Sequence, residues 1–406
     1  MAARRIGGVE PLITLTVDGE DVPAVLGEPI AVSLFAANRL VLGRSVKYHR
    51  PRGAACFAGR CDGCLMRVDG VPSVRTCRTE ARAGGTVTTQ NVLGSASVDL
   101  LAAADWFFPG GMNHHEMFTW ARPVNRAMQE VARRVAGIGT LPEEVAAPVP
   151  VERIQVDVLV IGAGVSGRAC ASALGALAVD ALVLEEEAAD LSSIGVAARA
   201  SCVALGVFDE TDGSRVVLAS SAAGLLAIHA RTIVIAQGAA ETSEAFEGND
   251  KPGILSVDAA ERLFAHGVLP GMKPVICGSG DRAVALASLF EKHGAVPVRI
   301  ARADLLRASG RAAVRSVETR DHQKHACDVL VVEGRSSACF ELAAQAGVEV
   351  RFDGEGFFLV ASREDGATRH PAVFVVGSAA SITGEAEARA HGARAAARIA
   401  EARARG

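Results

Sequence analysis

The sequence has few aromatic residues, no long apolar run and almost no net charge. Aromatic residues make up 4% of the 406 residues, and the formal net charge is −4. So small a charge gives no field that would gather nucleic acid. The longest apolar runs, such as 233–236 and 373–376, fall far short of the roughly 20 residues that a membrane helix needs. We therefore expect no nucleic-acid partner and no membrane span, and the absence of an apolar signal region near the N-terminus predicts a cytoplasmic protein.

What the chain does contain is typical of an α/β protein. Half of its residues are apolar and 42 are glycine, a composition that suits closely packed Rossmann-type layers better than an aromatic-rich β-sandwich. A chain of this length can bury more than one core, so two or three domains are expected. The predicted fold is an N-terminal β-grasp, ferredoxin-like domain followed by a two-lobed Rossmann-type dinucleotide-binding domain.

Three segments follow from the pattern along the chain. Residues 1–92 show two short strands, a helix over 30–37 and a cysteine-rich loop, the order of a β-grasp domain. Residues 93–150 hold both tryptophans, Trp106 and Trp120, and form either a linker or a subunit-contact surface. From Val156 onward, strands and helices alternate, so residues 151–406 are expected to form a parallel sheet with crossover helices and a nested second lobe at about 250–365.

Four of the nine cysteines are concentrated in one region. Their spacing, C-x4-C-x2-C-x12-C, is given by Cys56, Cys61, Cys64 and Cys77. This spacing matches plant-type [2Fe–2S] sites, in which each of two irons takes two thiolates. A structural zinc site is the alternative, but it usually has two C-x2-C pairs and the second pair is missing. Glycines in the loop are expected to let backbone N–H groups point toward the sulfurs.

A dinucleotide fingerprint starts at Gly162. It follows an apolar strand, opens a helix and is followed about twenty residues later by an acidic residue at the end of a second strand. Gly162 makes the tight turn, Gly164 lets a pyrophosphate approach, Gly167 lets helix and strand pack closely, and Glu185 would accept hydrogen bonds from a ribose. The predicted binding residues of this region are Gly162, Ala163, Gly164, Val165, Ser166, Gly167, Glu185 and Glu186.

Two later strand ends are predicted to return to the same nucleotide. Gln237 and Gly238 follow one strand, with Gln237 where flavoproteins usually have threonine. Gly377 and Ser378 follow the last strand, and Ser378 stands where such proteins usually have the aspartate that holds the ribityl chain. These departures weaken the case for FAD and leave NAD or another adenine nucleotide open.

A second, weaker dinucleotide fingerprint contains Gly278 and Gly280 as its first two glycines. The strand after it ends at Arg302 without an acidic residue, so a bound NAD would lack its ribose partner. Either Arg302 selects a 2′-phosphate or the lobe is vestigial, and we favour the second interpretation.

Several stretches resemble one family. Residues 42–53 (LGRSVKYHRPRG), residues 249–255 (NDKPGIL) and the Gly377-Ser378 ending resemble the alpha subunit of heterotetrameric sarcosine oxidase and the related proline, hydroxyproline and opine dehydrogenases. The resemblance implies a subunit that binds a dinucleotide and helps to enclose an FMN at its contact with a flavoprotein beta-type subunit. The chain would be a short form that lacks the aminomethyltransferase domain and has the four cysteines. The basic group Lys47, Tyr48, His49 and Arg50 would hold a flavin phosphate or face an acidic partner surface, unless it is only a solvated strand end.

The sequence therefore predicts an iron–sulfur and dinucleotide-binding subunit of an amine or amino-acid oxidase or dehydrogenase. The substrate would bind in the flavoprotein partner, further small subunits could be present, and electrons would pass from flavin to the [2Fe–2S] cluster. No catalytic residue is identified in this chain. Two alternatives are a self-contained NAD(P)H-dependent flavin/ferredoxin reductase and a non-catalytic scaffold subunit with a structural nucleotide.

Overall fold

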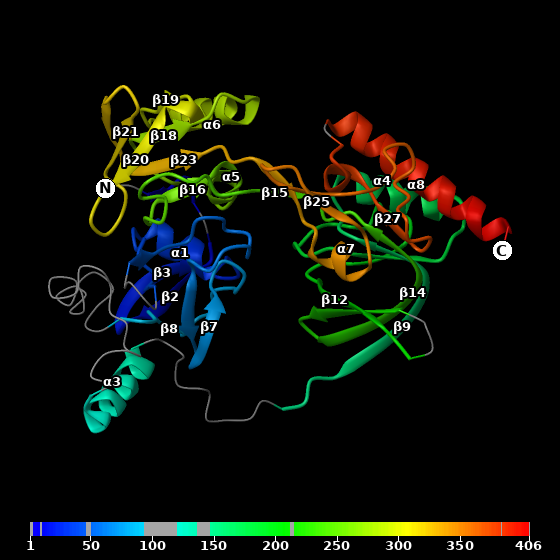
Figure 1. The fold of residues 1–406 in the computed structure, drawn as a ribbon, viewed down its shortest axis with the longest axis horizontal. Coiled ribbons are helices and arrows are strands. Elements are labelled where there is room, and N and C mark those ends of the chain that lie inside the picture. The colour runs from blue at the N-terminus through cyan, green and yellow to red at the C-terminus, as the bar shows by residue number, and fades with distance from the viewer. Residues whose placement is uncertain are drawn as a thin grey trace. The chain divides into compact units, whose positions relative to one another are not determined.

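The computed structural model describes residues 3–8, 10–45, 50–92, 120–135, 147–211, 215–382 and 384–405. The chain forms two compact units, each made of segments that are distant in sequence (Figure 1). Unit 1 consists of Met1–Val145 and Ser243–Gly334, and unit 2 consists of Ala146–Thr242 and Arg335–Gly406. Lys47, Tyr48, His49 and Trp106, which the sequence singled out, lie outside the described residues.

The N-terminal part of unit 1 is a small mixed sheet with one helix packed on it. Its sheet has the order β3-β2-β8-β6-β7, in which β2 and β3 form a hairpin and β2 runs parallel to β8. Asp18 and Gly19 have positive φ in the hairpin turn. This is the predicted β-grasp arrangement. Its elements are β1 (Arg4–Arg5), β2 (Leu12–Val17), β3 (Glu20–Val25), α1 (Ile30–Ala36), β4 (Gly43–Arg44), β5 (Pro51–Arg52), β6 (Leu65–Val68), β7 (Val71–Arg75) and β8 (Thr86–Thr88).

The second part of unit 1 is a parallel four-stranded sheet of order β16-β23-β18-β19, accompanied by α5, α6 and a small antiparallel sheet. Every strand of the parallel sheet except β19 is largely buried, as expected for strands covered on both faces. Its elements are β16 (Ile254–Ser256), α5 (Val257–Ala265), β17 (Val268–Leu269), β18 (Pro274–Cys277), α6 (Asp281–Lys292), β19 (Val298–Ile300), η2 (Arg302–Asp304), β20 (Leu305–Ser309), β21 (Ser316–Thr319), β22 (Lys324–Ala326) and β23 (Val329–Val332).

These two parts of unit 1 share one hydrophobic core. Buried side chains of α1, such as Leu34 and Phe35, belong to the same cluster as Leu263 of α5 and Phe290 of α6. A backbone pairing joins them as well, since β1 runs antiparallel to β17. Residues Ser243–Gly334, which the chain inserts between the two segments of unit 2 and which we call the inserted lobe, therefore complete the core of the N-terminal domain.

Unit 2 is built on a seven-stranded sheet of order β11-β10-β9-β14-β13-β12, with β27 pairing on β14. Its elements are β9 (Val151–Ile161), α4 (Val165–Ala176), β10 (Ala181–Leu184), β11 (Ala197–Arg199), β12 (Val203–Asp209), β13 (Arg215–Ser221), β14 (Gly224–Ile235), β15 (Ala239–Glu241), β24 (Ser336–Ala338), α7 (Glu341–Gln345), β25 (Val350–Phe352), β26 (Phe357–Leu359), β27 (Val373–Val375), η3 (Gly377–Ala380) and α8 (Glu385–Arg405).

The expected strict alternation of strands and helices from Val156 onward is wrong for one part of this unit. Strands β12, β13 and β14 follow one another without a helix and pair antiparallel. Short connections such as the one between Ser221 and Gly224 cannot cross over the sheet, so they impose antiparallel pairing.

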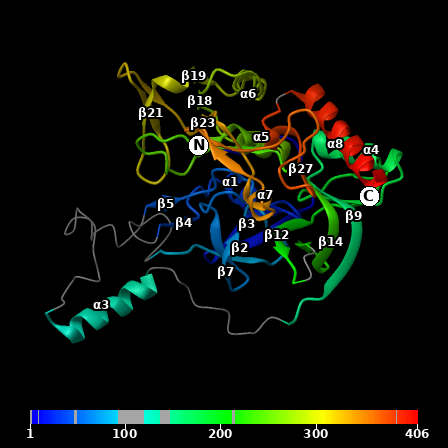
Figure 2. The same cartoon turned by 45° about the vertical axis from the view of Figure 1, so that its right-hand side comes forward.

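Side chains of the central strands alternate between two cores. Val158 and Val160 of β9 belong to the cluster that contains Ala395 of α8, whereas Leu159 and Ile161 belong to the cluster on the opposite face. Helices α4 and α8 lie side by side in both views (Figures 1 and 2). This packing holds α4 in place, and the first residues of α4 lie at one edge of the sheet.

In the part of the chain that the structure describes, no helix is both long enough and apolar enough to cross a membrane.

Candidate cluster site and nucleotide site

The four predicted cluster cysteines come together in the loops before β6 and after β7. The Sγ atoms of Cys56 and Cys61 are 3.3 Å apart, and so are those of Cys64 and Cys77. Metal–thiolate bonds are about 2.3 Å long, so each pair can hold one iron between its sulfurs. The donor set of four thiols in two pairs therefore fits a [2Fe–2S] cluster. Cys64 and Cys77 are buried, while Cys56 and Cys61 are half-buried.

The backbone around the loop donates to these sulfurs. Ala58 N–H donates to Cys56 Sγ at 3.4 Å, and Gly59 N–H donates to Cys77 Sγ at 3.3 Å. Gly59 has φ +72°, a conformation that strains residues with a Cβ. The expectation that loop glycines would let N–H groups reach the sulfurs holds for Gly59, whereas Ala58 was not anticipated.

The thiols also influence one another. A hydrogen bond with Cys61 lowers the pKa of Cys56, and a hydrogen bond with Cys77 lowers the pKa of Cys64 to about 7. The hydrogen bond with Cys56 raises the pKa of Cys61, and hydrogen bonds with Cys56 and then Cys64 raise the pKa of Cys77. Thiols at such short separation share protons that bound metal ions would replace.

The other five cysteines lie elsewhere and are buried. Burial raises the pKa of Cys170, Cys277 and Cys327 to about 12, which keeps these thiols protonated and unreactive. Cys277 on β18 is fully buried and belongs to the core.

Two of the stretches that carry the family resemblance meet beside the cysteine loop. Arg50 Nη1 lies 3.4 Å from Asp250 Oδ2, and a Cβ on Gly53 would lie 2.9 Å from Pro252 Cβ. Ser256 N–H also donates to the carbonyl of Ala55 at 3.3 Å. Residues 249–255 thus support the loop that carries the cysteines, a role that the sequence alone did not indicate.

The first glycine-rich loop joins β9 to α4 in unit 2. Gly162 has φ +104°, and a Cβ there would lie 2.5 Å from the carbonyl oxygen of Ala236. A Cβ on Gly167 would lie 2.0 Å from the carbonyl oxygen of Gly162. Gly164 differs, because it has an ordinary φ of −68° and a Cβ there would meet nothing within 4 Å. Gly162 and Gly167 are therefore required by packing, and Gly164 faces open space at the start of α4.

Glu185 comes from the neighbouring strand and meets this loop. Its carboxylate accepts the N–H of Ala163 at 2.6 Å and that of Glu187 at 2.9 Å. Arg168, which sequence reasoning missed, donates to the carbonyl of Ala163 at 2.9 Å. Glu185 and Arg168 thus both form hydrogen bonds with this loop. Glu186, by contrast, is exposed.

The other predicted segments reach the same edge of the sheet. Ala236, directly before Gln237 and Gly238, packs on Gly162 and Gly167. Gly377 has φ +70°, and a Cβ there would lie 2.2 Å from Ser166 Oγ on α4. The side chain of Ser378 is exposed. The structure thus brings together the three strand ends on which the sequence prediction was based.

His391 on α8 is a further residue of this edge that the sequence prediction missed. It is fully buried, accepts the N–H of Gly377 on Nδ1 at 3.2 Å and has Nε2 3.3 Å from the carbonyl of Ser362. These partners require the neutral ring with its proton on Nε2. Burial lowers the pKa of His391.

This histidine should make stability depend on pH. The folded state holds its pKa below the unfolded value of about 6.5, so the unfolded state binds more protons as the pH falls below that value. When the pH falls from 7.5 to 5.5, the unfolding free energy of wild type is expected to decrease by up to about 1.4 kcal/mol more than that of His391→Gln. Urea unfolding at both pH values measures the difference. The exposed His322→Gln variant should follow wild type, and equal pH slopes for wild type and His391→Gln would contradict the prediction.

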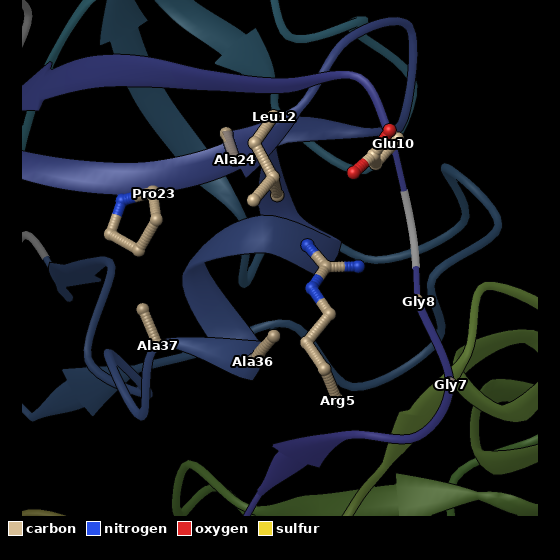
Figure 3. Close-up of a pocket in the computed structure, with 9 residues that line it drawn as sticks. All are labelled: Arg5, Gly7, Gly8, Glu10, Leu12, Pro23, Ala24, Ala36 and Ala37. Atoms are coloured by element: carbon tan, nitrogen blue, oxygen red, sulfur yellow. The ribbon is translucent and has the colours of Figure 1, made fainter.

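One cavity of about 330 Å³ lies apart from both sites, in unit 1 beside β1 and the end of α1. Figure 3 shows Arg5 directed into it, between Leu12 and the Gly7–Gly8 segment. The guanidinium of Arg5 is paired with both oxygens of the buried Glu28, and Ala24, Ala36 and Ala37 supply apolar lining. This cavity contains no group suited to redox chemistry.

Comparisons with known proteins agree with the cluster site. Residues 10–92 match the family described as "2Fe-2S iron-sulfur cluster binding domain". Over 87 residues the chain is 33% identical to hydrogen cyanide synthase subunit HcnA of Pseudomonas aeruginosa, covering 20% of this chain and 83% of HcnA.

Longer matches extend over most of the chain. It is 28% identical over 336 residues to sarcosine oxidase subunit alpha of Rhizobium meliloti, covering 71% of this chain and 34% of that subunit. The chain thus spans about a third of the length of the curated alpha subunits that it matches. The crystal structure of L-proline dehydrogenase from P. horikoshii aligns with 98% of this chain and 75% of its own, with a TM-score of 0.75 and 21% identity. The last match establishes the shared fold.

Proposed function

We infer that this chain belongs over residues 10–92 to the 2Fe–2S cluster-binding family and over most of its length to the sarcosine oxidase alpha-subunit family. On that premise we propose that it is the electron-transferring subunit of an amine or amino-acid oxidase or dehydrogenase complex. The substrates that supply electrons to this complex would be sarcosine-like N-methyl amino acids, proline or an opine. The observation that carries the proposal is the presence, in one chain, of four paired cysteine thiols and an open glycine-rich nucleotide loop.

The chain's own residues define two tasks. Cys56, Cys61, Cys64 and Cys77 hold the cluster, and the N–H groups of Ala58 and Gly59 stabilise negative charge on the sulfurs. In unit 2, the N-terminus of α4 and the space in front of Gly164 receive the pyrophosphate of FAD or NAD, and Glu185 accepts from the ribose. When bound, flavin supplies the conversion of a two-electron donor into single electrons that an iron–sulfur cluster can carry.

A second flavin, FMN, is proposed at the contact with a flavoprotein beta-type subunit. Arg50 is 61% exposed on its side chain and belongs to the basic group with Lys47, Tyr48 and His49. A cationic group of this kind suits a flavin phosphate. Asp250 lies beside Arg50 and fixes its position next to the cysteine loop.

The substrate is proposed to bind in the partner. Among the residues that the structure describes, no side chain of either site is identified as a general base for amine oxidation, and Ser378 cannot replace the carboxylate usual at its position. The isolated chain is therefore expected to show no dye reduction with sarcosine, proline or an opine, whereas co-expression with a flavoprotein oxidase chain should give an active complex. The decisive measurement is whether the amine reduces the cluster in that complex, read as a rhombic EPR signal. A monomer that reduces dye alone would contradict the proposal, and an active complex whose cluster stays oxidised would favour the scaffold alternative.

Aromatic residues of the segment 93–150 are proposed to contact the partner. Trp120 is 84% exposed, and Trp106 lies in the same segment. Central tryptophans of interfaces commonly contribute about 2 kcal/mol each. Trp106→Ala combined with Trp120→Ala should weaken the complex more than tenfold in a titration with the partner, while the cluster absorption stays unchanged. Phe208→Ala, which removes a half-exposed ring of unit 2, is the control, and equal effects of the two changes would disprove a dedicated contact segment.

A further inference from the structure

The second glycine-rich loop of the chain, in the inserted lobe, has the geometry of a nucleotide loop. Gly278 and Gly280 lie between the buried strand β18 and helix α6, and Gly280 is the N-cap of this helix of twelve residues. A dinucleotide bound to such a loop places its pyrophosphate over the glycines, against the helix N-terminus.

That space is filled by a side chain of the protein. Glu333 directly follows β23, and its Oε2 accepts the N–H of Gly280 at 2.9 Å. A Cβ on Gly278 would lie 2.5 Å from Glu333 Oε2, and a Cβ on Gly280 would lie 2.3 Å from Glu333 Oε1. At the corresponding glycine of the first loop, Gly164, a Cβ would meet nothing within 4 Å, although Glu185 binds the N–H of the preceding Ala163. The two loops thus differ in whether a carboxylate already lies against the second glycine, where the pyrophosphate would approach.

The cationic residue of this lobe is also engaged by a carboxylate. Arg302, the candidate for recognising a 2′-phosphate, has Nη1 3.2 Å from Glu244 Oε1. Arg282, next to Gly280, is bound instead by Asp258 and Glu261 of α5. Both of these arginines therefore already have carboxylate partners.

We propose that the inserted lobe is closed to nicotinamide dinucleotides by its own acidic side chains. The carboxylate of Glu333 occupies the pyrophosphate position, and Glu244 takes the place of a 2′-phosphate on Arg302. Reducing equivalents therefore neither enter nor leave this chain through NAD(P)H at this lobe. The inference is independent of the proposed function, because it concerns residues that belong neither to the cluster site nor to the first nucleotide loop.

The test measures NADH and NADPH binding by nucleotide fluorescence, with the first loop blocked by Gly164→Val. In this background, the chain with Glu333 intact is expected to bind neither nucleotide at a concentration of about 1 mM, which is the weak end of the range of typical KM values. Adding Glu333→Ala should open the space and tighten binding at least about tenfold, which corresponds to about 1.4 kcal/mol. Glu333→Gln keeps the volume of the side chain and should leave the lobe closed.

A further variant separates the two carboxylates. Adding Glu244→Ala to Glu333→Ala should favour NADPH over NADH, because Arg302 is then available to the 2′-phosphate. Cluster absorption and the thermal midpoint confirm that each variant is folded. Binding to the lobe with Glu333 intact, no gain with Glu333→Ala, or an equal gain with Glu333→Gln would each overturn the proposal.

Discussion

Replacing Cys64 with serine is expected to remove the iron–sulfur cluster. Cys64 is fully buried, and its sulfur forms a 3.3 Å pair with that of Cys77. A hydroxyl is a much poorer ligand for iron than a thiolate, and no other described cysteine belongs to the group. Iron and acid-labile sulfide should fall from about two per chain each, the content of this cluster type, to nearly zero. The absorption and the EPR signal should disappear with them.

The matched control is Cys170→Ser, which changes an equally buried cysteine of unit 2. It should retain the full iron and sulfide content, although both variants place a hydroxyl in a core. Because metal binding contributes directly to folding, Cys64→Ser should also lower the thermal midpoint of unit 1. Anaerobic reconstitution should not restore the midpoint of wild type. One zinc per chain without sulfide in reconstituted wild type would contradict the cluster assignment.

Changing Gly164 to valine is expected to abolish dinucleotide binding without unfolding the chain. The residue has an ordinary φ, and a Cβ there would meet no protein atom within 4 Å. The valine side chain would instead fill the space that the pyrophosphate needs. Mass analysis of heat-released ligand should find FAD or NAD in wild type and less than about a tenth of that amount in the variant, a loss of more than 1.4 kcal/mol in binding.

Two further variants make the result interpretable. Gly8→Val places the same side chain at a glycine of unit 1 that also has open surroundings, and it should retain the ligand. Gly167→Ala should instead destabilise unit 2, because its Cβ would lie 2.0 Å from a carbonyl oxygen. Full ligand occupancy in Gly164→Val would show that the pyrophosphate lies elsewhere.

The sequence predicted features that depend on local spacing. Three of the four cluster cysteines lie within nine positions, so their ligand role follows from the loop alone. The Gly162–Gly167 pattern and Glu185 were found for a similar reason, since a strand, a turn and a helix define them. Both the β-grasp order and the α/β fold follow from these motifs and from the hydrophobic pattern.

What the sequence did not predict depends on contacts between distant segments. His391 of α8 lies 14 residues after the Gly377 N–H that it binds, and Glu333 lies 53 residues after the Gly280 N–H that it binds. One signal was available: Glu333 directly follows four apolar residues, as Glu185 does, and the carboxyl ends of parallel strands meet at one edge. The boundary of the inserted lobe was also hidden, because hydrophobic periodicity does not reveal which core a strand joins.

The core that α1 shares with α5 and α6 determines when the cysteine loop can become stable during synthesis. Val87 and Leu255 belong to this single cluster, yet the whole first half of unit 2 lies between them in the chain. The N-terminal domain therefore leaves the ribosome with an apolar face that only a much later segment can cover. Such long-range closure slows folding and exposes that face to aggregation. Assembly machinery that delivers iron and sulfide would accordingly meet an incomplete domain until residues near 331 have been made, which couples cofactor insertion to the late steps of folding.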